Sequence, residues 1–173
     1  MSSHVEIQTG YCRIKGQKQG IFPGDGVQSD RAGANFFPVY SHKYSCATPV
    51  NSETARAEHN VKHDPYVLTA ELGPPTTAAF TSATNNEVLQ TVEIVFTKTG
   101  KNGGECDFFK ITLENAQISH KSLYTAELGT VGGKTRTSTM MRLELTFTKM
   151  TQENVMEDTK QTMASHDIRK PKG

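Results

Sequence analysis

The stretch Val92-Glu-Ile-Val-Phe-Thr-Lys98 decides the fold class. Its apolar residues Val92, Ile94 and Phe96 recur at every second position. This is the period of a β-strand whose two faces meet different surroundings. The alternation extends over residues 88–99, and it predicts a strand with one buried face.

A second alternating run follows the turn signal Lys101-Asn-Gly-Gly104. Residues 108–119 place apolar side chains on one face and polar side chains on the other. The apolar face comprises Phe109, Ile111 and Leu113. The polar face comprises Lys110, Thr112 and Glu114. The two runs together predict an antiparallel hairpin.

A third run of the same kind lies at Met141 to Lys149. One face comprises Met141, Leu143, Leu145 and Phe147. The other comprises Arg142, Glu144, Thr146 and Thr148. Because such a strand buries only its apolar side, its polar face must meet water or a polar interface.

One short helix is predicted from Thr76 to about Glu87, after the strand-breaking Gly73-Pro-Pro75. Thr76 or Thr77 can cap its start, and Asn85-Asn86 would end it. A helix of this length is too short to be stable alone, so we expect it to pack on the sheet.

The rest of the chain adds short strands and long connections. Extended segments are predicted at residues 11–15, 36–44 and 66–72. Loops are predicted at Gly16–Asn35, Cys46–Lys62 and Gly129–Ser138, which are rich in glycine or in polar residues. From Thr151 the chain becomes polar, and we expect a weakly ordered tail. The prediction is a mainly β fold with one short α-helix and long loops.

Charge and length exclude several classes of protein. Lys and Arg total 19 against 18 for Asp and Glu, a net charge of +1. This balance provides no electrostatic attraction to nucleic acid or to an anionic membrane. The 173 residues suffice for one domain. The start Met1-Ser-Ser-His4 has neither the charged nor the apolar region of a signal peptide, so we expect the protein to begin in the cytoplasm.

No catalytic, cofactor or metal site is predicted. Cys12, Cys46 and Cys106 form no CxxC pair, which argues against a zinc cage. His59 and His63 are four residues apart, but Glu58 precedes them where the HExxH motif would have it follow the first histidine. The six histidines are scattered over separate segments and indicate no site. The profile favours assembly or binding over catalysis.

Three blocks in the same order resemble the haemolysin-coregulated protein (Hcp) family. They are Ile14-Lys-Gly-Gln-Lys-Gln-Gly20, His63-Asp-Pro-Tyr-Val-Leu-Thr-Ala-Glu-Leu72 followed by Pro75-Thr-Thr77, and the predicted hairpin. The resemblance covers about residues 11–150. In two places the chain departs from the family pattern. It has Gly73-Pro-Pro-Thr-Thr77 in place of an acidic residue and serine, and Ala70 in place of a common lysine. The first departure leaves the start of the helix open.

The resemblance implies a two-sheet β-barrel with one helix over residues 1–150, followed by the tail 151–173. It implies a structural protein that forms homohexameric rings, and rings that stack into the inner tube of the type VI secretion system. The implied partners are further copies, the sheath and spike proteins, and effector proteins carried in the lumen. The subunit would be assembled in the cytoplasm and secreted by the machine without a signal peptide.

The implied ring suggests roles for two groups of residues. A closed ring of identical subunits needs two complementary surfaces on each subunit, and a polar strand face can line a wet lumen. The candidate lumen or subunit-interface residues are Lys110, Thr112, Glu114, Arg142, Glu144 and Thr146. The loop at Cys46–Lys62 is the candidate for reaching an adjacent ring, through Ala47, Asn51, Glu53, Arg56, Glu58 and His59.

Two alternatives stay open at this stage. One is a phage-like tail-tube protein, which the resemblance also allows. The other is a monomeric ligand-binding β-barrel. A ring in solution would argue against the second alternative.

Overall fold

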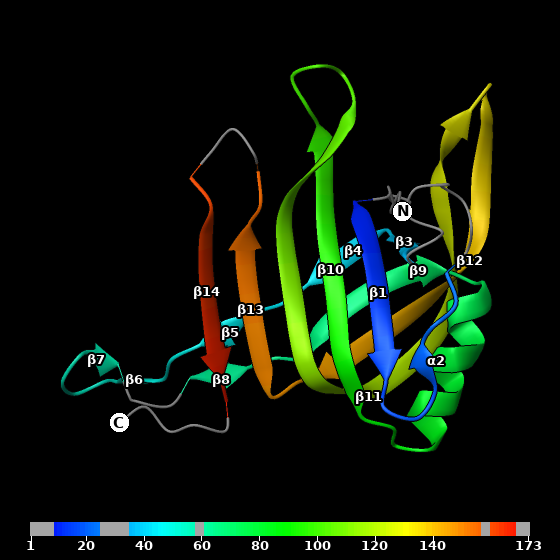
Figure 1. Ribbon diagram of the computed structural model, residues 1–173. Helices are drawn as coiled ribbons and strands as arrows, with labels where there is room; N and C mark the ends of the chain where they lie inside the picture. The colour runs from blue at the N-terminus through cyan, green and yellow to red at the C-terminus, as the bar shows by residue number, and fades with distance from the viewer. Residues whose placement is uncertain (1–8, 25–34, 58–60, 157–159, 169–173) are drawn as a thin grey trace.

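The computed structural model describes residues 9–24, 35–57, 61–156 and 160–168. Strands dominate this part of the chain, and its single helix lies against one flank (Figure 1). The predicted mainly β fold is confirmed. Within the described residues, no helix has the length and the apolar character that crossing a bilayer requires.

The strands follow one another along the chain, with the helix α2 (Pro74–Thr84) between the ninth and tenth. The longer strands are β1 (Gly10–Gly16), β9 (Tyr66–Glu71), β10 (Leu89–Thr99), β11 (Glu105–Val131), β12 (Lys134–Thr146), β13 (Lys149–Asn154) and β14 (Thr162–Asp167). The short strands are β2 (Gly20–Ile21), β3 (Phe37–Val39), β4 (Ser41–Lys43), β5 (Cys46–Ala47), β6 (Val50–Asn51), β7 (Arg56–Ala57) and β8 (Lys62–His63).

Two antiparallel sheets form the body of the molecule. We call them sheet B, in the order β14-β13-β11-β10-β1-β3, and sheet A, in the order β11-β12-β9-β4. Strand β11 belongs to both, because its first half pairs with β10 and β13 and its second half with β12. On the other side residues 37–43 join the sheets, pairing first with β1 and then with β9. This is the expected two-sheet architecture.

The predicted hairpin is formed by β10 and β11, and its buried and exposed faces are those that were predicted. Val92 pairs with Leu113, Ile94 with Ile111 and Phe96 with Phe109, so each apolar residue of β10 lies opposite one of β11. Val92 and Ile94 are completely buried. Such facing pairs stabilise an antiparallel sheet by about 0.2–1 kcal/mol each.

The core lies between the two sheets. It comprises Cys12, Ile14, Phe22, Phe37, Val39, Tyr66, Leu68, Ala70, Ala78, Ala79, Leu89, Val92, Ile94, Ile111, Leu113, Ala116, Met141, Leu143, Leu145, Phe147 and Met150. Burial of each large apolar side chain in this set contributes about 1.5–3 kcal/mol. The predicted apolar face of the third run is confirmed, since Met141, Leu143 and Leu145 are fully buried.

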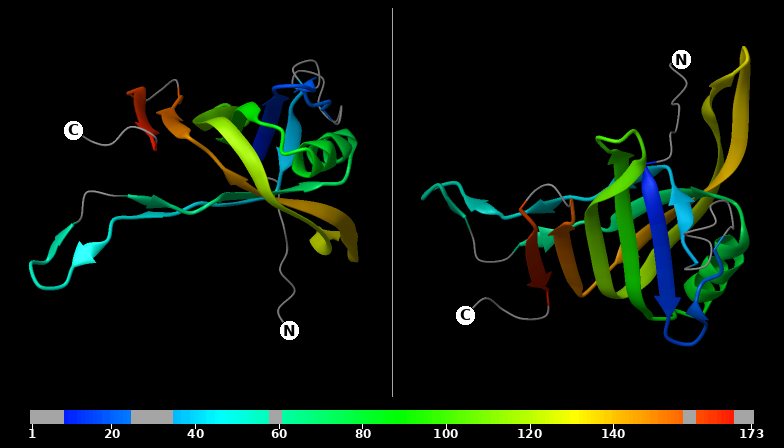
Figure 2. Two further views of the ribbon diagram at one scale, coloured as in Figure 1. Left: turned by 90° about the horizontal axis from the view of Figure 1, so that it is seen from below. Right: turned by 45° about the horizontal axis from the view of Figure 1, so that its top comes forward.

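The prediction of a loop at Gly129–Ser138 is wrong. Strand β11 continues to Val131, and β12 begins at Lys134. Only Gly132 and Gly133 turn the chain, with φ of 60° and 76°. Consecutive positive φ values characterise the tightest hairpin turns, and glycine adopts them without steric cost. The outcome is a hairpin that projects beyond the body (Figure 2).

The helix begins two residues earlier than predicted, because prolines are tolerated in the first turn, where N–H groups have no helical partner. Pro74 and Pro75 occupy that turn, and the Gly73 N–H donates a hydrogen bond of 3.0 Å to Thr76 Oγ1. The departure from the family pattern thus does not prevent the helix from starting here. The helix ends at Thr84 with Asn85 as its C-cap, so the stop signal at Asn85-Asn86 is confirmed, whereas the predicted extent to about Glu87 is three residues too long. Asn86 follows with a φ of 51°.

The predicted loop at Cys46–Lys62 is largely an extended two-stranded arm. Strand β5 pairs with β8 and β6 pairs with β7, and the arm extends away from the body (Figure 2). Residues 58–60 lie outside the described residues, as do residues 25–34 of the other predicted loop, Gly16–Asn35. The part of that loop that is described contains β2, which pairs with the end of β1.

Two strands occupy much of the predicted polar tail. Strand β13 pairs with β11, and β14 pairs with β13 to form the edge of sheet B. Sequence analysis predicted no strand after Lys149. The division of the chain after residue 150 and weak order of the tail in solution stay predictions.

One buried carboxylate links the turn between β1 and β2 to the helix α2. Glu87 Oε1 accepts hydrogen bonds from the backbone N–H groups of Lys18 and Gln19, at 2.5 and 2.8 Å. Glu87 Oε2 accepts from Gln19 Nε2 and from Ser82 Oγ, at 2.6 and 2.8 Å. A Cβ at Gly16 would approach this carboxylate to about 3.1 Å. Burial by itself would raise the pKa of Glu87, but the four hydrogen bonds lower it to about 2.

We therefore expect Glu87→Gln to lower the free energy of unfolding at neutral pH by about 2 kcal/mol, since hydrogen bonds to a charged group are lost. The lowered pKa makes this stabilisation fully present above about pH 4.5 and lost as the pH falls toward about 2. Urea unfolding at neutral pH and at about pH 3 measures both effects. The control Glu53→Gln, on the exposed arm, should change stability by less than about 0.5 kcal/mol. Equal stability of both variants would contradict the assignment.

Candidate functional site

The outer face of sheet B carries the first predicted group of polar residues. Lys110, Thr112 and Glu114 are half-buried and point away from the core residues Ile111 and Leu113. Register places Thr112 between Glu93 of β10 and Thr151 of β13, so this polar face spans three strands.

Ion pairs connect the strands across this face. The Glu93 carboxylate pairs with Arg13 Nη2 at 2.5 Å and with Lys110 Nζ at 3.3 Å. Lys149 Nζ lies 3.2 Å from Glu114. These side chains are partly exposed, and exposed pairs of this kind contribute about 0–1 kcal/mol each. Together they connect β1, β10, β11 and β13 across this face.

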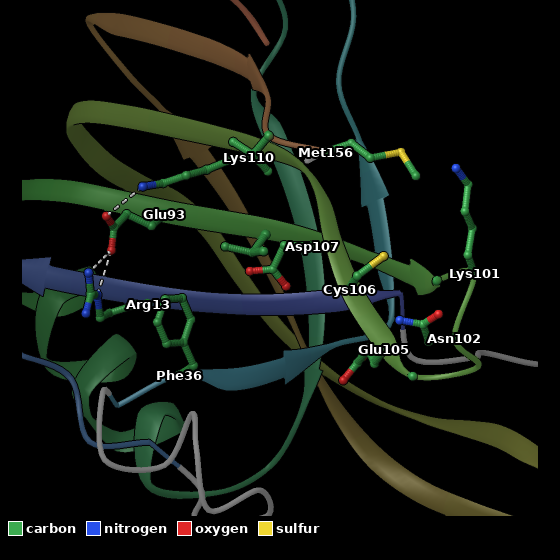
Figure 3. A pocket seen from close by; sticks show the side chains of 14 residues that line it. Arg13, Phe36, Glu93, Lys101, Asn102, Glu105, Cys106, Asp107, Lys110 and Met156 are labelled. Carbon is green, nitrogen blue, oxygen red and sulfur yellow. Dashed lines mark hydrogen bonds and ion pairs between the residues drawn. The ribbon is translucent and has the colours of Figure 1, made fainter. Parts of the chain in front are cut away.

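A groove of about 890 Å³ opens at one end of the same face (Figure 3). Arg13, Glu93 and Lys110 form one wall, and the turn after β10 supplies Lys101 and Asn102. The remaining lining residues are Phe36, Val95, Gly100, Gly104, Glu105, Cys106, Asp107, Val155 and Met156. Sequence analysis missed this groove because it joins residues from opposite ends of the chain.

The second predicted group of polar residues lies on the outer face of sheet A. Arg142 and Glu144 are half-buried, Thr146 is exposed, and Arg142 Nη2 lies 3.2 Å from Glu144 Oε1. The core lies between the two sheets, so the two predicted groups face away from each other on opposite sides of the body. They form two surfaces and not one site.

The arm exposes the third predicted group of residues. Ala47, Asn51, Glu53 and Arg56 are all exposed, whereas Glu58 and His59 lie outside the described residues. Asn51 Oδ1 accepts the backbone N–H groups of Glu53 and Thr54, at 2.9 and 3.3 Å, which shapes the tip. The arm thus presents its side chains to solvent on a backbone that is hydrogen-bonded near its tip.

An aromatic and histidine cluster lies where the arm leaves the body. Tyr44 Oη and His63 Nδ1 are 2.6 Å apart, and the His63 and His166 rings stack with centroids 5.1 Å apart. A second hydrogen bond of 3.0 Å joins His42 Nδ1 to Tyr66 Oη, and the Tyr44 and Tyr66 rings stack. The fold brings three histidines into this cluster, from β4, β8 and β14, which their spacing in the sequence did not indicate.

Burial changes the acid–base behaviour of this cluster. It lowers the pKa of His42 to about 4. Burial, followed by the positive charge of His166, lowers the pKa of His63. Burial also raises the pKa values of Tyr44 and Tyr66. The Nε2 atoms of both His42 and His63 are buried without a hydrogen-bond partner in the described part of the chain.

The thiols give no sign of a metal centre or a disulfide. Cys12 is buried in the core, Cys106 is half-buried and Cys46 is exposed, and all three are free. Burial, with a smaller contribution from Glu93, raises the pKa of the Cys12 thiol. Among the described residues, no three His, Cys, Asp or Glu side chains are placed to hold a metal ion.

Comparison with known proteins identifies a family. The sequence model described as "Type VI secretion system effector, Hcp" matches residues 11–153. No curated protein sequence matches the chain.

Solved structures of similar fold include three Hcp proteins. One described as "Crystal structure of Hcp protein" is 20% identical, with a TM-score of 0.77 over 92% of this chain and 99% of that chain. A mutant of Hcp1 from the E. coli EAEC 042 pathovar is 17% identical, with a TM-score of 0.75 over 93% and 99%. Secreted protein Hcp3 from Pseudomonas aeruginosa is 19% identical, with a TM-score of 0.69 over 94% and 99%. At such identities these matches support the fold.

Proposed function

The chain belongs to the Hcp family of type VI secretion system proteins, and from this premise we propose that it is a non-catalytic, ring-forming subunit of the secretion tube. The observation that carries the proposal is the family match over residues 11–153. The two-sheet body with separate polar faces and a projecting arm supports it.

The two flanks of the body differ, as a ring of identical subunits requires. On one flank, β14 pairs only with β13 among the described strands, which leaves its other edge without a backbone partner there. On the opposite flank lies α2 (Figure 1), with Phe80 60% exposed and the nearby strand residue Leu123 54% exposed. Unlike surfaces that meet head to tail generate a closed ring when the rotation closes. An unpaired sheet edge is a ready site for such contact.

Sheet B is the better candidate for the lumen wall. It runs from β14 on one flank to β1 and β3 toward the other, so copies placed flank to flank would continue its outer face around the ring. The face with Lys110, Thr112 and Glu114 would then line a wet lumen that holds effector proteins. The face with Arg142, Glu144 and Thr146 would lie on the outside of the tube, where the sheath and spike proteins act.

Assembly would precede export. Rings form in the cytoplasm under this proposal, stack into a tube, and leave the cell with the effectors that they carry. Export by the machine itself would require no signal peptide on the subunit.

The first prediction concerns size in solution. We expect light scattering coupled to gel filtration to give a mass of about six subunits, and negative-stain images to show a ring with a central opening. A chain that stays monomeric at high concentration would overturn the proposal and would favour a monomeric binding domain that uses the groove of Figure 3.

The second prediction concerns the arm. Deleting residues 47–59 should leave single rings intact and weaken their stacking, because the described part of this stretch, residues 47–57, extends away from the sheets and contributes no residue to the core. Sedimentation velocity separates single rings from stacks. The matched control is Val131→Ser, which changes an exposed residue on the other projecting hairpin and should leave stacking unchanged. Dissociation of the deletion variant to monomers would contradict the assigned role.

The third prediction locates the lumen. In a Cys46→Ser, Cys106→Ser background, Thr112→Cys should react with a small maleimide but not with one wider than the pore. Thr146→Cys should react with both reagents. The opposite result would assign the lumen to sheet A, and protection of either thiol from both reagents would place it in a subunit interface.

A further inference from the structure

The stack of His63 on His166 joins two parts of the molecule that are otherwise separate. His63 lies in β8, at the base of the arm, and His166 lies in β14, the edge strand of sheet B. Their ring centroids are 5.1 Å apart with an interplanar angle of 25°. Phe147 closes the cluster, with its ring centroid 5.8 Å from that of His63.

The stacked contact is stable when both rings are neutral and unstable when both rings are charged. Tyr44 Oη occupies His63 Nδ1 at 2.6 Å, while Nε2 is buried without a partner in the described part of the chain. A proton added to His63 would therefore leave a buried N–H⁺ without an acceptor. Burial of an unpaired charge is costly. Protonation of both rings would also place like charges in contact.

The neighbouring charged groups do not offset that cost through a hydrogen bond to His63 Nε2. The titratable groups of the packed elements are Tyr44, Cys46, Lys62 and Asp64 around His63, and Lys149, Glu153 and Asp167 around His166. The Asp64 carboxylate accepts the hydroxyl of Ser45. Asp167 follows His166 in the strand, so its side chain points to the opposite face of the sheet.

We propose that His63 and His166 form an acid-sensitive clasp, which holds the base of the arm against β14 at neutral pH and releases β14 in mildly acidic solution. The sign follows from the lowered pKa of His63. The unclasped state binds more protons, so the clasped state loses stability as the pH falls below about 6.5. The release requires no ring, so the test of the clasp is independent of the test of the proposed function.

Amide hydrogen exchange of the full chain tests the release. At about pH 7.5 and about pH 5, with rates corrected for intrinsic exchange, we expect the protection of residues 162–167 to fall about tenfold at the lower pH. Protection of β10, in the middle of sheet B, should stay constant. Limiting the range to about pH 5 keeps the buried His42, with its pKa of about 4, neutral.

Two variants separate the clasp from general acid sensitivity. His166→Phe keeps a ring for stacking but removes the like-charge repulsion between the two rings, so the fall in β14 protection at the lower pH should become smaller. The control His120→Phe removes an exposed histidine of β11 and should keep the wild-type response to acid.

Two results would overturn the clasp. One is a protection of wild-type β14 that is the same at both pH values. The other is a protection of β14 in His166→Phe that is kept at the higher pH and lost completely at the lower pH. If His166→Phe folds poorly, NMR titration of the wild-type histidine ring protons decides instead. A His63 that titrates at or above the ordinary histidine pKa of about 6.5 would overturn the proposal. A lower value that rises toward the ordinary one in His166→Gln would support it.

Discussion

The backbone hydrogen bonds of β11 join the two sheets, because this strand runs through both and pairs with β10, β13 and β12. Up to Ala116 it pairs with β10, and from Gln117 it pairs with β12. The change of sheet coincides with a φ of 49° at Asn115 and with a shift of register between Ile118 and His120. Such irregularities bend a strand and increase its twist. The bend folds one continuous strand around the core, so Leu113 in sheet B and Leu143 opposite Lys121 in sheet A bury their side chains in the same interior.

Sequence analysis succeeded where burial imposes a period on the residues. Val92, Ile94 and Leu143 alternate with polar neighbours because one face of each strand meets the core, and the predicted hairpin and third strand follow from that. The long hairpin around Gly132 was missed for the same physical reason. Both of its faces meet solvent, so no alternation marks its strands. The strand residues 162–165 of β14 are likewise all exposed.

The residues predicted for the lumen or a subunit interface lie on the outward faces of their strands, but how they group in space depends on the fold. Alternation shows that Thr112 and Thr146 point away from the core. It does not show that the two lie on opposite sides of the molecule. The cluster of His42, His63 and His166 could not be predicted from spacing, since contact between β8 and β14 depends on how far sheet B extends beyond β11. The sequence also predicts a helix that runs to about Glu87, whereas the Glu87 carboxylate connects Ser82 of the helix to the turn between β1 and β2.

If the protein forms rings as proposed, the edge of β14 that has no partner among the described strands matters for each subunit before it assembles. Backbone groups that stand ready for a neighbouring chain do not distinguish a correct neighbour from a partly folded one. In the proposed ring, a newly made subunit would therefore be most prone to aggregate while it is free, and capture of that edge by the next subunit would remove the hazard. In the proposed ring, rapid assembly would protect this exposed strand edge, as a chaperone protects the edges of other proteins with incomplete sheets.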